Sequence, residues 1–116
     1  FNEINNTNPF CSKYLQPIDG PRAPDYPKTA LRRGKEGCVY LDFVINEEGK
    51  TEDIKGDWSV PKKTFNKNAI KYVSDLVYPT PKNKSGLPTT TRGKTILVFK
   101  IQDKNKPLDY IPPGCQ

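Results

Sequence analysis

The sequence predicts an α+β fold, a three-stranded antiparallel sheet with one longer helix packed on a face and a short preceding helix, in the order α-β-β-α-β. Three observations predict it. Apolar residues alternate in GCVYLDFVINEEGK, residues 37–50; they recur every three or four positions over 65–77; and KTILVFKI, residues 94–101, is rich in β-branched side chains. A sheet carrying one amphipathic helix on a face buries all three apolar stripes in one core.

The first expected element is a short helix within PDYPKTALRRG, residues 24–34. Asp25 can cap its start, Pro27 suits a first helical turn and Gly34 ends it. We expect about two turns.

The stretch 37–50 predicts a strand and a hairpin turn. One face of the strand is apolar, made of Val39, Leu41, Phe43 and Ile45, and the other carries Cys38, Tyr40, Asp42 and Val44. Gly49 can take the positive φ that the turn needs. A second strand is expected from Thr51 to Trp58, with Trp58 completing the core above the longer helix.

The longer helix follows from a change of period. Its apolar stripe is formed by Phe65, Ala69, Val73 and Leu76. Pro61 is tolerated in a first turn and Pro79 forbids continuation. After a long loop, residues 94–101 form the last strand.

The 116 residues are expected to form one compact domain with two polar ends. Residues 1–21 are interpreted as a polar N-terminal extension, 22–102 as the folded domain and 103–116 as a Pro-rich polar tail. No apolar run is long enough to cross a bilayer and no leader is recognisable. Because the chain begins with Phe1, we expect a mature or trimmed product that lacks its signal or anchor.

The formal net charge is +6, and the basic residues are scattered without interleaved aromatics. This distribution favours a solvated basic surface over a nucleic-acid site. The carboxylates of the hairpin, such as Glu48 and Asp53, are typical of a solvated turn. We therefore expect neither an enzyme nor a cofactor, and no nucleic-acid partner.

There are three cysteines and no histidine. This composition excludes His-based catalytic triads and argues against a zinc site. A disulfide between Cys11 and Cys115 would tie down the two polar ends and would require an oxidising compartment. Pairing of Cys38 with either of the others stays open, because sequence does not determine connectivity.

The order of several residues resembles the TonB C-terminal domain family. The matching positions are Tyr26–Pro27, Ala30, Gly37, the Val39–Ile45 strand, Gly49, Phe65, Ala69, Tyr78 and Val98 to Ile101. The resemblance covers residues 22–102. This sequence departs from the family pattern at Leu76, where the family has a tryptophan. It also departs at Ala23 and Asp25, where the family has the polar residues that precede the Tyr-Pro and touch the box region.

The resemblance implies a periplasmic protein-binding domain of Gram-negative bacteria, following an inner-membrane anchor upstream of Phe1. It would capture an extended segment, the TonB box, of an outer-membrane transporter by strand addition in energy-dependent transport. The implied partner-binding residues are Tyr26, Pro27, Thr95, Ile96, Leu97, Val98, Phe99, Lys100 and Ile101. Family members also exchange strands, so a homodimer is a second expected partner.

Lys94 and Lys100, at the two ends of the last strand, are expected to attract an acidic partner segment. The alternative is a stand-alone structural or interaction protein of the cell envelope, with a TonB-like fold and no energy-transducing role. In that case residues 103–116 would pack back over the sheet and cover the edge of the last strand.

Overall fold

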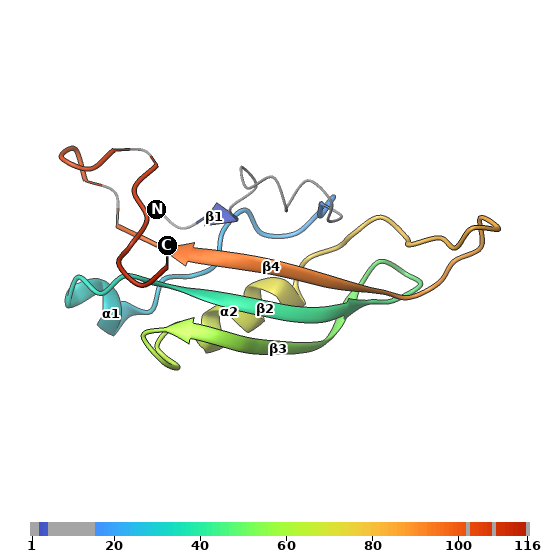
Figure 1. Cartoon of the computed structure of the whole chain (residues 1–116), viewed down its shortest axis with the longest axis horizontal. Coiled ribbons are helices and arrows are strands. Elements are labelled where there is room, and N and C mark those ends of the chain that lie inside the picture. The colour runs from blue at the N-terminus through green and yellow to red at the C-terminus, as the bar shows by residue number, and fades with distance from the viewer. Residues whose placement is uncertain (1–2, 5–15, 102, 108, 116) are drawn as a thin grey trace.

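The structure is a computed structural model, and it describes residues 3–4, 16–101, 103–107 and 109–115. Figure 1 shows its elements along the chain. They are β1 (Glu3–Ile4), α1 (Lys28–Arg32), β2 (Gly37–Ile45), β3 (Thr51–Val60), α2 (Asn66–Ser74) and β4 (Thr91–Phe99).

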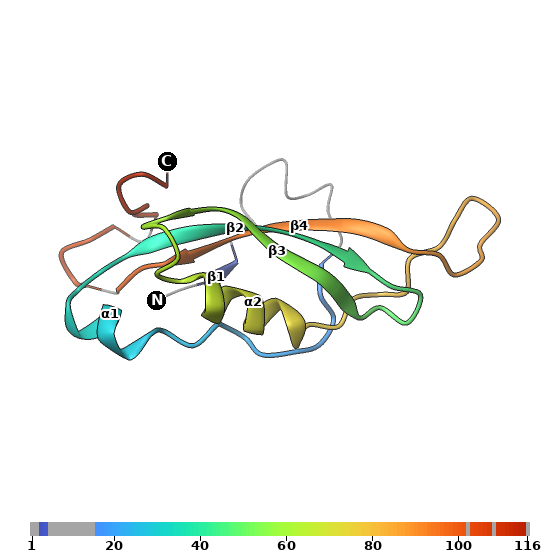
Figure 2. The same ribbon diagram turned by 90° about the horizontal axis from the view of Figure 1, so that it is seen from below.

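The strands form one antiparallel sheet in the order β1-β4-β2-β3. Helix α2 covers one face of it, as Figure 2 shows. The expected three-stranded sheet, longer helix and short preceding helix are therefore confirmed. The two-residue strand β1 is an addition that the sequence did not predict, because so short a strand has no periodicity to detect.

The core lies between α2 and the sheet face that carries the apolar side of β2. Val39, Leu41, Phe43 and Ile45 are each at most 2% exposed and pack in one cluster with Ala69 and Val73 of α2. At one end of this core the rings of Phe65 and Phe99 stack with centroids 4.5 Å apart. Tyr26 meets both rings edge-on, at 5.5 Å and 5.8 Å between centroids. The aromatic cluster fixes the end of β4 against the helix layer.

Trp58 does not complete this core, so the expectation from its spacing to Ile54 was wrong. The strand β3 shifts register against β2 between the pairs Tyr40↔Trp58 and Leu41↔Gly56, which leaves Asp57 as an extra residue. A bulge of this kind reverses the side on which the following side chains lie. Trp58 therefore shares the helix-free face with Tyr40 and is 46% exposed.

The cysteine pairing also differs from the expectation. Cys38 bonds to Cys115 across 77 positions of sequence, while Cys11 lies outside the described residues. Cys38 lies on the helix-free face of β2, and Figure 2 shows the C-terminal tail and α2 on opposite sides of the sheet. The pairing follows from the tail folding over that face, which no local pattern in the sequence reveals.

A turn in the tail is seated on the same face. The Cys115 amide donates to the Pro112 carbonyl at 3.1 Å, and Gly114 takes the positive φ of 87° that such a turn needs. A Cβ on Gly114 would lie 3.0 Å from a methyl carbon of Val60, so the turn lies directly over β3. Within the described part of the chain, no helix is long and apolar enough to cross a membrane.

Candidate functional site

The strand β4 presents the candidate functional edge of the sheet. Its inner side pairs with β2 without a register break over nine residue pairs, from Gly37↔Phe99 to Ile45↔Thr91. Its outer side receives β1, antiparallel, with Glu3 opposite Val98 and Ile4 opposite Leu97. Figure 1 shows β1 lying beside the last part of β4. Among the described residues, Thr91 to Ile96 have no strand partner on that outer side.

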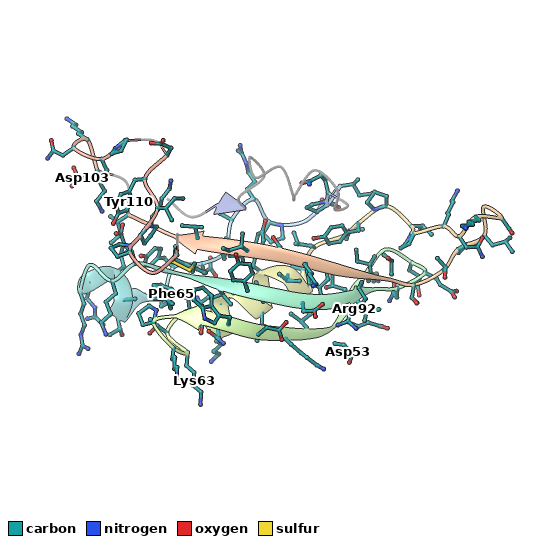
Figure 3. All side chains as sticks on the ribbon, in the orientation of Figure 1. Asp53, Lys63, Phe65, Arg92, Asp103 and Tyr110 are labelled. Atoms are coloured by element: carbon teal, nitrogen blue, oxygen red, sulfur yellow. A yellow bond between two sulfur atoms is a disulfide. The ribbon has the colours of Figure 1, made fainter. Side chains whose placement is uncertain are left out.

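The β4 edge ends near the Ile101 amide, which donates its hydrogen bond to the carboxylate of Glu36. Ile101, two residues past β4, donates its amide to Glu36 Oε2 at 2.7 Å. The same oxygen accepts from Lys106 Nζ at 3.0 Å, and Glu36 Oε1 accepts from the Tyr110 hydroxyl at 2.9 Å. Figure 3 shows Tyr110 of the tail near the arrowhead of β4. Glu36 thus joins the end of β4 to the tail.

The Glu36 side chain is 11% exposed. Burial opposes its ionisation, but the hydrogen bonds from the Ile101 amide, Lys106 and Tyr110 outweigh burial and hold the pKa of Glu36 below its ordinary value of 4.5. The ionised carboxylate is therefore the form that the fold stabilises.

The two lysines that flank the last strand in sequence have different environments. Lys94 is exposed, as expected for a residue that attracts an acidic segment. Lys100 is 7% exposed and donates from Nζ to the Tyr110 carbonyl at 3.1 Å. The expectation that Lys100 faces a partner was therefore wrong, because the tail that binds it is placed by a disulfide remote in sequence.

Tyr26 and Pro27 lie at the start of α1, next to the aromatic cluster at the end of β4. The Tyr26 hydroxyl donates to the Lys35 carbonyl, and burial, with the nearby Glu36 charge, raises the pKa of Tyr26 to about 12. Pro27 precedes Lys28 as the N-cap residue of α1. Both residues are half-buried. Tyr26 therefore supports the strand end from beneath through its contact with Phe99.

The opposite edge of the sheet is β3, and it is irregular. Its pairing with β2 shifts register twice, and Asp53 in one of the shifted regions has a positive φ of 51°. Its exposed residues include Glu52, Asp53, Lys55 and Asp57. Bulges and charges on an edge strand prevent pairing with another chain. Of the two strands that pair with β2, β4 therefore has the more regular backbone.

Sequence reasoning missed two parts of this site, β1 and Glu36. The strand β1 leaves no periodic signal, and Glu36 is one of several charged residues in RRGKEG. A signal for Glu36 is its position immediately before the alternating strand, where a side chain can reach the neighbouring strand end. Among the described residues, no group of three or more cysteine, aspartate or glutamate side chains could hold a metal ion.

Comparison with known proteins agrees with this geometry. The sequence profile of the family described as "Gram-negative bacterial TonB protein C-terminal" matches residues 22–101. The protein TonB of Pseudomonas aeruginosa is 28% identical over 81 residues, which are 70% of this chain and 23% of that protein. The chain thus spans about a quarter of the length of this curated relative.

Two solved structures are similar over most of the chain. The solution NMR structure of the Pseudomonas aeruginosa TonB C-terminal domain is 26% identical, with a TM-score of 0.66, covering 80% of this chain and 92% of that one. The TonB2 protein of Vibrio anguillarum is 28% identical, with a TM-score of 0.59, covering 78% and 85%. TonB C-terminal domains are periplasmic, non-enzymatic interaction domains of Gram-negative bacteria. Because the family profile spans both helices and all three long strands, this chain belongs to the TonB C-terminal domain family.

Proposed function

We propose that this domain captures an extended segment, the TonB box, of an outer-membrane transporter by strand addition to the outer edge of β4. The capture takes place in the periplasm and serves energy-dependent transport. Main-chain hydrogen bonds supply the affinity in such a mode, while alternate side chains supply the specificity.

The observation that carries this proposal is the pairing of β1 with β4. An extended piece of chain already lies antiparallel on this edge, opposite Leu97 and Val98. The edge is therefore compatible in shape and hydrogen bonding with an added strand. A partner segment would take the place of β1 on this edge and continue toward Ile96 and Thr95, where the described chain leaves the outer side without a strand.

The surroundings of β4 support the same assignment and limit its extent. Leu97 and Phe99 are fully buried toward α2, so the edge is held by the core. The Ile101 amide and the Lys100 ammonium are both engaged by neighbouring groups. The partner-binding segment is therefore centred on Thr95, Ile96, Leu97, Val98 and Phe99, with Tyr26 and Pro27 as supporting residues.

The rest of the transport machinery belongs to the proposal as well. An inner-membrane anchor upstream of Phe1 would couple the domain to the energy source, and an edge strand would allow pairing of two copies into a homodimer. The curated relative is about four times as long as the matched region, which leaves room for such parts in that protein.

The test is an NMR titration of the oxidised chain with a TonB-box-like peptide, following the backbone amides. Strand addition predicts chemical-shift changes concentrated on Thr95 to Phe99, together with changes at Glu3 and Ile4 as β1 is displaced. The β3 amides serve as an internal control for non-specific effects, and they should not change.

A matched control peptide carries proline at alternate positions, so that it lacks the amides that pair with β4. It should bind much more weakly than the parent peptide. Equal binding of both peptides, or an absence of changes on β4 in both the oxidised and reduced protein, would contradict strand addition.

One observation favours a second candidate, a stand-alone envelope interaction protein. The described tail residues pack over the sheet through Cys115, Gly114 and Tyr110. They cover one end of the helix-free face, however, and leave the β4 edge to β1. Release of the tail by mutation of Cys115 separates the two candidates, because only the transducer retains peptide capture at β4.

A further inference from the structure

The helix-free face of the sheet carries an aromatic row, defined here as Ile96, Tyr40 and Trp58, which are neighbours in register across β4, β2 and β3. Tyr40 is 49% exposed and Trp58 is 46% exposed, and their ring centroids are 5.5 Å apart. Figure 1 looks onto this face, with α2 behind the sheet. Two large exposed aromatics side by side on a sheet are typical of a binding surface.

The rows on either side of the aromatic row differ in chemistry, because one is apolar and the other is charged. Toward the strand ends near the tail, Val98, Cys38 and Val60 lie in register, and the tail reaches this row through Cys115 and Gly114. On the other side, Lys94 and Lys55 flank Asp42 in register. The aromatic row therefore lies next to a row of residues that the turn in the tail already covers.

That turn indicates which chemistry the face accepts. It contains Pro112, which is among the largest fully buried side chains of the protein. Its backbone makes a turn hydrogen bond of its own from Cys115 to Pro112, so it adds no strand to the sheet. This proline-containing turn is thus joined to the face by the Cys38–Cys115 disulfide and lies over Val60 through Gly114.

The ring geometry limits the ligand further. The Tyr40 and Trp58 planes are inclined at 64°, so they form a corner and share no plane. A corner of this kind is a poor platform for a flat ring system, but it suits a compact and rigid pyrrolidine ring. Aromatic-lined surfaces bind proline-rich segments because these are already extended and lose little entropy on binding.

The charges beside the row favour an acidic partner. Lys55 and Lys94 are both exposed, while Asp42 is paired with Arg92 at 2.8 Å and is only 16% exposed. The carboxylate in the row next to the aromatic row is thus neutralised, and Glu52 lies farther away, opposite Val44. Lys55 and Lys94 therefore remain available to acidic side chains.

From these contacts we propose that the aromatic row is a second docking surface, which binds an acidic, proline-rich segment of a partner protein. This inference goes beyond capture at β4, because it uses side chains of the sheet face and no edge hydrogen bonds. Proline residues have no backbone N–H to donate to a strand edge, so they are suitable ligands for the aromatic row.

The test uses the full oxidised chain and a synthetic peptide of about ten alternating proline and glutamate residues, the repeat unit of an extended polyproline helix. The chain has one tryptophan, so the Trp58 indole N–H gives a single resolved NMR probe. We expect saturable shifts at Trp58, Tyr40 and Ile96. Trp58→Ala should weaken binding about tenfold or more, as loss of an interface tryptophan does.

Leu87→Ala is the matched control variant, because Leu87 is an apolar side chain that is 60% exposed in the loop before β4. It should bind like the original protein. A Lys55→Glu/Lys94→Glu variant should lose the glutamate peptide and gain a proline–lysine peptide of the same length. A dispersed amide spectrum of each variant checks that it folds.

Three results would overturn the proposal. They are an absence of shifts in the aromatic row, equal binding of a serine–glutamate peptide, or binding of anionic phospholipid vesicles in place of the proline–glutamate peptide. Trp58→Ala should leave the titration with the TonB-box-like peptide at β4 unchanged. Failure of this docking surface and failure of strand addition are therefore distinguishable.

Discussion

The two edges of the sheet are built in different ways. β4 pairs with β2 over nine residue pairs without a shift, whereas β3 pairs with the other side of β2 through two register shifts. The same central strand thus supports one regular edge and one irregular edge. The comparison teaches that a strand held by its buried side can keep a regular backbone at the edge, while bulges and charges disrupt an edge against pairing with another chain.

Burial follows the same division. The last three residues of β4 are all buried, but no residue of β3 is. The core therefore fixes β4 more firmly than it fixes β3. Two pairs of variants test this difference between the strands, and two further variants test what bounds the β4 edge, from the largest expected effect to the smallest.

The first prediction compares an apolar side chain that faces the core on each strand. Leu97→Ala removes a side chain that is 0% exposed and should lower the free energy of unfolding by about 2–5 kcal/mol. Ile54→Ala on β3 should cost about 1–2 kcal/mol, because Ile54 is only partly buried against the core. Urea denaturation of both variants measures the difference. Equal losses would show that the two edges are held alike.

The second prediction compares a glycine on each strand. A Cβ on Gly93 would lie 2.4 Å from the Phe43 ring, which is fixed in the core, so Gly93→Ala should cost about 1–3 kcal/mol. A Cβ on Gly56 would meet the side-chain amide of Asn66 at 2.9 Å, which can rotate away. Gly56→Ala should therefore cost less in the same urea experiment, and a larger loss for Gly56 would contradict this account.

The third prediction concerns competition for the β4 edge. A Glu3→Pro/Ile4→Pro variant removes the amide donors of β1 and should raise the affinity for a TonB-box-like peptide about 2- to 10-fold. Isothermal titration calorimetry measures the change, with Lys84→Ala in the loop before β4 as the control. An unchanged affinity would mean that β1 and the peptide do not share the edge.

The fourth prediction concerns the point where the β4 edge ends. Because the folded state lowers the pKa of Glu36, its contribution to stability is present above the ordinary value of 4.5 and is lost as pH falls through the folded-state pKa. Glu36→Gln should therefore show a smaller decrease in melting temperature on acidification than the original protein. Parallel decreases in a thermal series from neutral to acidic pH would contradict a stabilising role for the carboxylate.

The long elements were predictable because their signals are local. The alternation of Val39 to Ile45 and the helical stripe of Phe65, Ala69 and Val73 each correspond to one buried face. Such periodicity persists whatever the rest of the chain does. The resemblance built on these elements accordingly identified the right family, with the profile matching residues 22–101.

The features that sequence missed depend on contacts between distant segments. The Asp57 bulge reversed Trp58, the Cys38–Cys115 bond placed the tail on the helix-free face, and the tail in turn buried Lys100. A single extra residue in a strand leaves no trace in composition, and a disulfide partner is set by the tertiary path. The tail and β1 therefore had to be read from the structure.

The most direct test of strand addition is a set of intermolecular NOEs between the isotope-labelled chain and an unlabelled TonB-box-like peptide. Antiparallel pairing predicts contacts between α-protons of the peptide and those of β4 around Thr95 to Val98, with the contacts of Glu3 and Ile4 lost. Contacts to β3 or to the helix-free face, with β1 still in place on β4, would contradict the account.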